Sequence, residues 1–498
     1  MENEKVVDRI AEKVSLFKKA IKDMIATNDR AYQKGSHYRA FSNPIRNYTK
    51  DEVLDIIHRG TLSNQQKLSN DFYDISGIYR RIILYNATML KYTGILIPDV
   101  IAANKDLTDS SLQKRYKKTL DFIDKINLPT ILSDFSLKAL INGCYYGVIL
   151  DISQDYISIL DLPAQYCCSR YKTANNEDLI EFNLQYFYSI SDPDERELAL
   201  SVYPKEIRTA FRKYEKGKKG KWFLIPSTIG ICFPVHDGRP PFLSSIPAII
   251  DYDDYVELEK ERDEDEVKKI LIQKVPHLND GKLLFEPDEA EEMHAGAVGM
   301  MKNNKNVNVL TTYADADIIS SQSTNDTSRN NIEKILKVIY DEAGISSELF
   351  AATGNLTLDK SIKNDLSFMM YLCNKYNNFI TNIINRFFSN SQIKFKYKIL
   401  PISYYNDTDY LNNTHKLASS GYSFILPALA ADLSQKDLVN VKDLEEALGL
   451  RDKLIPLSTS YTEAANSDEG GAPQKSEEEK SDKTLDNEEA LDSSGGEE

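Results

Sequence analysis

The chain has 498 residues, of which 41% are hydrophobic and 28% charged, and its formal net charge is −15. A chain of this length usually forms about two to four domains with a sizeable core. The negative charge argues against a protein that binds nucleic acid through an overall basic face. The start, MENEKVVDRIAEKV, lacks the pattern of a signal peptide, and no apolar run approaches the ~20 residues of a membrane span. Five irregularly spaced cysteines favour reduced thiols, so we expect a protein that is made in a reducing cytoplasm.

The N-terminal part of the chain is predicted to be helical. In VVDRIAEKVSLFKKAIKDMIATN the apolar residues recur at spacings of three and four, which indicates one buried helix face. The dense apolar and aromatic stretch NDFYDISGIYRRIILYNATMLKYTGILIP follows and ends at Pro98. Two more helices are predicted in YKKTLDFIDKINLPTILSDFSLKALIN, and from Gly143 the composition becomes that of strands.

A β-rich unit is predicted from Tyr145 to Phe187. The apolar period there is two, in YYGVILDISQDYISILDLPAQYC and in DLIEFNLQYFYSI. The stretch FRKYEKGKKGKWFLI then suggests a basic hairpin that leads into Trp222. Its basic residues are Arg212, Lys213, Lys216, Lys218, Lys219 and Lys221. Such a cluster either contacts phosphate or is solvated, and solvation is the commoner case.

The second half of the chain alternates strong helices with mixed segments. An acidic helix is predicted after Pro241, with ten acidic and four basic residues between Asp251 and Lys269. Short strands are predicted in GKLLF, NVNVLTTY and ADIIS, before a helix in STNDTSRNNIEKILKVIYDEAG that ends at Gly344. A long helix is predicted from about 358 to 388, followed by a strand in QIKFKYKILPISYYN and helices in DYLNNTHKLASSG and VKDLEEALGL.

The search for catalytic chemistry identifies no enzyme motif. A phosphate-binding loop, an H-E-x-x-H helix and a G-x-S-x-G elbow are all absent, and the six histidines are scattered. We therefore predict no catalytic residue, no cofactor and no metal ligand. One carboxylate series leaves an alternative open, because residues three and four apart share a helix face and could hold a metal. Its members are Asp251, Asp253, Asp254, Glu257, Glu261 and Asp265. A solvated acidic helix face is the commoner explanation.

The order of these segments resembles the portal protein of tailed bacteriophages, over about residues 50–460. The resemblance rests on FYDISGIYRRIILYNATMLKY, on KALINGCYYGVILD with ISILDLPAQYCCSRY, and on YDEAGISSELFAATGN between two helices. An acidic tail is also common in that family. Here, twelve Asp and Glu and three Lys lie between Asn466 and Glu498, which gives this segment a charge of −9.

The resemblance implies an α+β, mainly helical portal fold that forms a ring around a central channel. The implied parts are a wing at 1–243, a first stem helix at 244–272, a clip at 273–323, a second stem helix at 324–344, a tunnel loop at 345–357, a long wing helix and strand at 358–404, a crown at 405–457 and a disordered acidic tail at 458–498. It also implies which residues face DNA. In the tunnel loop and just after it these are Ser346, Ser347, Glu348, Thr353, Gly354, Asn355 and Lys360, and on the first stem helix Asp254, Glu257, Glu261 and Asp265.

The implied function is a conduit rather than an enzyme. The ring, usually of about twelve subunits, would sit at one capsid vertex of the virion after assembly in the host cytoplasm. Its partners would be double-stranded viral DNA, the terminase large subunit, the major capsid and scaffolding proteins, and a head-completion or adaptor protein, with no membrane. An acidic stem fits this role because Lys and Arg contacts to phosphate would hold the DNA and slow its movement. The alternatives are a metal-dependent nucleic-acid enzyme that uses the Asp251–Asp265 carboxylates, and a capsid-associated minor head or adaptor protein.

Overall fold

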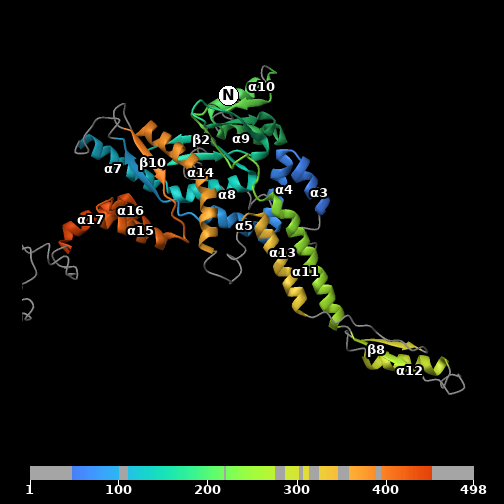
Figure 1. The fold of residues 1–498 in the computed structure, drawn as a ribbon. Coiled ribbons are helices and arrows are strands. Elements are labelled where there is room, and N and C mark those ends of the chain that lie inside the picture. Colours follow the sequence, from blue (N-terminus) through green and yellow to red (C-terminus); the bar gives the residue numbers. More distant parts are fainter. Residues whose placement is uncertain are drawn as a thin grey trace, which may run out of the picture. The chain divides into compact units, whose positions relative to one another are not determined.

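The computed structural model describes residues 48–99, 110–217, 220–267, 269–274, 287–301, 307–312, 325–345, 358–388 and 394–450. The fold is α+β and mainly helical, as the sequence predicts (Figure 1). The chain divides into two units, Met1–Lys436 and Asp437–Glu498. Of the second unit, the structure describes the part of helix α17 beyond Lys436 and the two residues after it. The predicted N-terminal helix and the acidic tail lie outside the described residues.

Short polar signals position the first helices. Helix α3 (Lys50–Arg59) begins with a capping box, in which Thr49 and Glu52 each accept a hydrogen bond from the other's backbone. Helices α4 (Leu62–Ile75) and α5 (Gly77–Thr88) are separated at Ser76, whose N–H ends α4 while its hydroxyl accepts from the Tyr79 N–H of α5. The apolar stretch predicted there therefore forms two helices, followed by strand β1 (Gly94–Pro98).

Helix α7 (Ser110–Lys125) and helix α8 (Leu128–Asn142) precede the β-rich unit. Gly143 ends α8 with a φ of +78°, and a Cβ there would lie 2.4 Å from the backbone of Arg239, so only glycine fits. Strand β2 (Cys144–Ile152) then lies between β3 (Ile157–Asp161) and β7 (Gly230–Pro234) in an antiparallel sheet. The change from helix to strand at Gly143 is as predicted.

The second antiparallel sheet has the order β4–β5–β6, with β4 at Cys167–Lys172, β5 at Asp178–Asn183 and β6 at Trp222–Leu224. The prediction of a strand through DLIEFNLQYFYSI was wrong in its second half, because Leu184–Ser189 forms a 3-10 helix. Its rings pack into a separate apolar cluster with Tyr203 and Phe211. These last two residues belong to the segment of helices α9 (Pro193–Val202) and α10 (Lys205–Glu215).

The main core contains a group of aromatic rings around helix α14 (Leu358–Phe387). Tyr376 of α14 meets Phe233 of β7 at 4.8 Å between ring centroids, and Phe135 of α8 stacks on Tyr145 of β2 at 4.2 Å. The Tyr376 hydroxyl is not left unpaired, because it hydrogen-bonds Ser136 at 2.9 Å. Strand β10 (Phe395–Ile399) pairs with β1 and packs against α14. The predicted helix at 358–388 and the following strand are both present.

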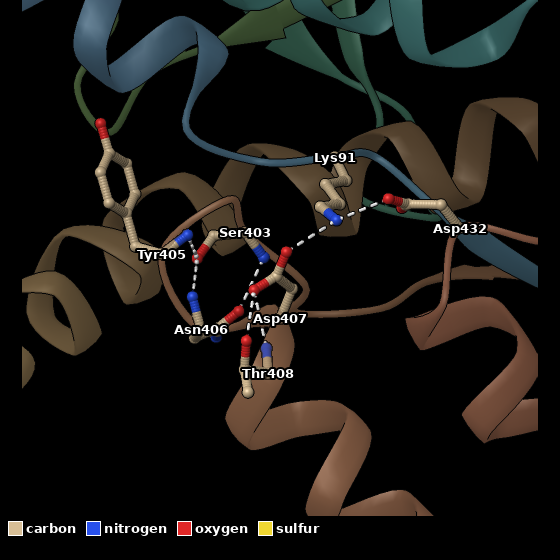
Figure 2. A network of polar contacts seen from close by, with 7 residues as sticks. All are labelled: Lys91, Ser403, Tyr405, Asn406, Asp407, Thr408 and Asp432. Atoms are coloured by element: carbon tan, nitrogen blue, oxygen red, sulfur yellow. Dashed lines mark hydrogen bonds and ion pairs between the residues drawn. The ribbon is translucent and has the colours of Figure 1, made fainter.

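The last helices of the first unit pack against the rest of that unit through an apolar cluster that is smaller than the main core. Helices α15 (Asp407–Ser419), α16 (Ile425–Ala430) and the start of α17 (Gln435–Leu448) follow β10. Leu400, Ile402 and Leu429 form the buried part of a small apolar cluster there. Beside it, the ammonium of Lys91 lies between Asp407, at 3.0 Å, and Asp432, at 2.8 Å (Figure 2). Helix α16 was missed in the sequence because ILPALA is too short to show a helical period.

Candidate functional site

Two helices that are distant in sequence form the candidate site. Helix α11 (Ile246–Val267) packs along α13 (Asn325–Glu342), and the two lie side by side in Figure 1. Both have one end in the main core. Ile246 and Ile249 at the start of α11 are almost fully buried, as is Ile339 near the end of α13. The pair is therefore anchored by apolar burial at the ends where the chain enters α11 and leaves α13.

A small unit is inserted between these two helices. Strand β8 (Lys269–Lys274) pairs in parallel with β9 (Val307–Thr312), and helix α12 (Pro287–Met301) connects them. Parallel strands cannot be joined by a tight turn, and α12 is the part of their long connection that the structure describes. The strand in NVNVLTTY was predicted correctly, whereas GKLLF and ADIIS lie outside the described residues. The first stem helix was predicted to reach residue 272, which was wrong, because α11 ends at Val267 and β8 follows.

Helix α12 was not predicted from PDEAEEMHAGAVGMM. Gly296 and Gly299 favoured a turn region, since glycine costs about 1 kcal/mol in a helix interior relative to alanine. In the structure both glycines lie inside the helix. The start signals were nevertheless present, with Pro287 as the first residue and Asp288 and Glu289 in the first turn.

The acidic residues predicted to line a channel do lie on one continuous helix. Asp254 and Glu261 are exposed on α11, and Glu257 between them is partly buried. Asp265 lies on the same helix near its end. Spacings of three and four place Asp254, Glu257 and Glu261 on one side of α11. Apolar side chains are exposed on the same helix pair, most clearly Leu258 at 60% and Val338 at 48%.

The metal-site alternative gains no support from the described residues. Asp251 forms an ion pair with Lys50 of α3, with 2.7 Å between ammonium and carboxylate. Within the described ranges, no three His, Cys, Asp or Glu side chains are grouped so that they could hold a metal ion. A carboxylate series along one helix needs ligands from a second element to complete a coordination sphere.

The predicted tunnel loop lies almost wholly outside the described residues. Six of its proposed DNA-facing residues fall there: Ser346, Ser347, Glu348, Thr353, Gly354 and Asn355. The structure does describe the end of helix α13, from which the chain enters the loop. The Gly344 N–H bonds the Asp341 carbonyl, the Ile345 N–H bonds the Tyr340 carbonyl, and Gly344 has a φ of +69°. Helix α13 thus ends at a left-handed glycine, as predicted. Lys360 lies in the first turn of α14.

The basic segment at 212–221 was predicted as a hairpin, and that was wrong. Arg212 and Lys213 are in the last turn of α10, and only the far side of the segment is a strand, β6. Helix α10 carries an apolar stripe of Ile207, Ala210 and Phe211, and the turn begins only after the helix and includes Gly217, whose φ is +68°. Lys218 and Lys219 lie outside the described residues.

A cleft of about 360 Å³ was not foreseen from the sequence. It lies where the β1 segment, α7 and the α16–α17 turn meet, and its lining includes Lys91, Asp124, Tyr404 and Lys436. Each lysine is already paired with two carboxylates: Lys91 with Asp407 and Asp432, and Lys436 with Asp121 and Asp124. The residues come from segments more than three hundred positions apart, so no local pattern could have indicated the cleft.

The shifted pKa values among the described residues follow from burial and pairing. Burial raises the pKa of Asp365 on α14, and a hydrogen bond from the Tyr85 hydroxyl opposes that shift. Burial also raises the pKa of the Cys373 thiol to about 12, which makes it a packing residue rather than a nucleophile. Burial alone would lower the pKa of Lys91, but its hydrogen bonds to Asp432 and Asp407 outweigh that effect and raise it. These pKa shifts therefore reflect side chains that are buried in the core and one ion-pair contact.

All five cysteines are free thiols. None of the helices in the described part of the chain combines the length and the apolar character needed to cross a membrane.

No protein-family model matches this chain, and no curated protein matches it significantly.

Proposed function

We propose that this chain is a portal protein of a tailed bacteriophage, a non-enzymatic subunit of a ring through which double-stranded DNA is packaged and ejected. One observation carries the proposal. Two helices anchored in the same core, α11 and α13, are separated by an inserted β8–α12–β9 unit and followed by the long helix α14. That order corresponds to stem, clip, stem and wing helix in the family that the sequence resembles.

In this proposal each segment has a role. Helices α11 and α13 are the stem, the inserted unit is the clip on which the terminase motor and later the adaptor dock, and 346–357 is most of the tunnel loop. Helices α15 to α17 belong to the crown. The capsid and scaffolding proteins contact the wing, and the assembled ring is part of the virion.

The charge and the exposed apolar surface of the stem favour this role. Asp254 and Glu261 would be repeated around the ring and would repel phosphate, so that DNA could move without being held. A closed ring also needs head-to-tail interfaces between subunits. Leu258 and Val338, which are exposed in the single chain, could be covered by a neighbouring subunit.

The first experiment is imaging of the full-length chain by negative-stain electron microscopy, together with native mass spectrometry, at high concentration and with the scaffolding protein present. We expect closed rings with a central channel. Monomers and dimers alone under these conditions would refute the portal proposal and leave the adaptor alternative. The metal-dependent enzyme is tested by thermal shift with Mg²⁺ or Mn²⁺, for which we expect no stabilisation.

A second experiment tests the channel wall in rings that have assembled. The double variant Asp254→Lys, Glu261→Lys replaces two acidic groups by basic ones, and we expect tighter retention of double-stranded DNA at low salt. The matched control makes the same change at Asp51 and Asp55, which are exposed on α3. Equal retention by the two variants would show that α11 does not face the DNA.

A further inference from the structure

One surface feature is independent of the proposed function. Lys213, Lys216 and Lys221 are exposed around the end of α10 and the start of β6, in a chain whose net charge is −15. We call these three lysines the basic island. None of them is paired with a carboxylate of the described residues. Arg212 in the same helix differs, since it is held by Glu197 and Glu215.

An exposed aromatic surface adjoins the basic island. Trp222 directly follows Lys221 and is 36% exposed, and the guanidinium of Arg170 lies over its ring at 5.3 Å from the centroid. Arg170 itself is paired with Glu181, with 2.6 Å between Nε and the carboxylate. Leu224, two positions along β6 and therefore on the same face as Trp222, is also exposed. Apolar and positively charged surfaces thus meet at one strand.

That strand lies at the edge of its sheet. The order is β4–β5–β6, and β6 pairs with β5 from Asn183↔Trp222 to Glu181↔Leu224. Within the described ranges no strand pairs with the other side of β6. An edge strand offers backbone N–H and C=O groups that can pair with another extended polypeptide.

We infer that the basic island and the β6 edge form a binding surface for an acidic, extended segment of another protein. The lysines would pair with its carboxylates, and Trp222 and Leu224 would contact its apolar groups. Two observations favour a polypeptide over nucleic acid. The arginines that could bind phosphate in a bidentate manner, Arg170 and Arg212, are already held by glutamates. A strand edge also pairs with a peptide backbone, for which a sugar-phosphate chain has no equivalent.

The experiment uses the fluorescence of the protein's own tryptophan to detect binding. Trp222 is the only tryptophan, so its fluorescence reports this surface alone. The full-length protein is titrated with a short tryptophan-free peptide in which glutamate and threonine alternate, which places the carboxylates on one face of an extended strand. A lysine–threonine peptide and a short DNA duplex serve as comparison probes. Calorimetry on the same samples measures affinity without relying on the fluorescence signal.

Two charge-reversal variants decide the result. We expect Lys213→Glu, Lys216→Glu, Lys221→Glu to bind the acidic peptide more than about tenfold more weakly than the natural chain. The control variant Lys114→Glu, Lys117→Glu, Lys118→Glu makes the same charge change on three exposed lysines of α7 and should bind normally. Circular dichroism and thermal melting check that both variants fold. Absence of peptide binding, equal weakening in both variants, or tighter binding of DNA than of the peptide would each overturn the inference.

Discussion

The main core and the C-terminal helical segment at 407–436 are held in different ways. Around α14 the core is a continuous group of buried aromatic and aliphatic side chains, in which Tyr376 and Phe135 meet rings from several elements. The segment at 407–436 buries only a small apolar cluster against the rest of its unit. Polar contacts supply much of its remaining attachment, through Lys91, Gln435 and Lys436.

This difference predicts different responses to perturbation. Apolar burial depends little on pH and salt, whereas ion pairs weaken when a partner is neutralised or screened. We therefore expect the main core to resist acid and salt better than the attachment of the 407–436 segment. Local opening of that segment would expose the edge of β1 before the core unfolds.

The largest expected effect is a loss of stability in the main core. Tyr376→Ala removes a fully buried ring and should lower the free energy of unfolding by about 3–5 kcal/mol, because the cavity cannot collapse among rigid aromatic neighbours. Urea denaturation measures the change. Tyr376→Phe keeps the ring and should cost only about 1 kcal/mol for the lost hydrogen bond to Ser136. Tyr422→Ala makes the same truncation at an exposed site, and an equal loss there would contradict the comparison.

The second largest effect is expected at Gln435, which helps to attach the segment at 407–436 to the rest of its unit. Its side-chain amide accepts from the Leu96 N–H at 2.7 Å and donates to the Tyr116 hydroxyl at 2.9 Å, so it occupies the free edge of β1. Gln435→Ala should cost about 1–3 kcal/mol, since a buried N–H loses its partner. Hydrogen exchange at the Leu96 amide should accelerate, while exchange in α14 stays slow. Gln113→Ala on the exposed face of α7 is the control, and unchanged exchange at Leu96 in Gln435→Ala would show that Gln435 does not protect β1.

The smallest effect comes from Lys91, whose side chain is only 7% exposed. Its partners Asp407 and Asp432 are partly solvated, so Lys91→Met should cost about 1 kcal/mol at neutral pH. The difference in melting temperature between the natural chain and the variant is the measurement. Lys398→Met, at an exposed position on β10, should leave the melting temperature unchanged.

The effect of Lys91→Met should depend on pH in a defined direction. The hydrogen bond from Lys91 lowers the pKa of Asp407, so this carboxylate stabilises the fold above its unfolded pKa of about 4 and ceases to do so as the pH falls through the folded value. The raised pKa of Lys91 gives a contribution that is lost only when the pH rises above about 10. The difference between natural chain and variant should therefore shrink in acid. A constant difference down to pH 3 would show that Lys91 acts through packing alone.

Local patterns predicted the long elements because their periods and end signals are strong. The seam of α14 and the end of α13 at Gly344 could both be read from the sequence. Errors occurred where glycines were taken to mark a turn although the residues around or before them form a helix. The glycines of α12 and the glycine-rich end of α10 suggested turns, yet Gly296 lies in a helix and Lys213 is in the last turn of another.

The sequence did not predict helices α3 and α9. By itself, it determined the longer elements, namely the change to strands at Gly143 and the helices α11, α13 and α14, and the placement of Asp254, Glu257 and Glu261 on one acidic helix. Both depend on residues close together in the chain. Only the tertiary structure decided that Ile249 and Ile339 share one core and that Lys91 pairs with Asp407 and Asp432. It also placed Arg170 over Trp222 beside the basic island. The physical reason is that these contacts join residues that lie dozens to hundreds of positions apart in the chain. They stabilise the protein only once the intervening chain has folded, so local sequence patterns do not indicate them.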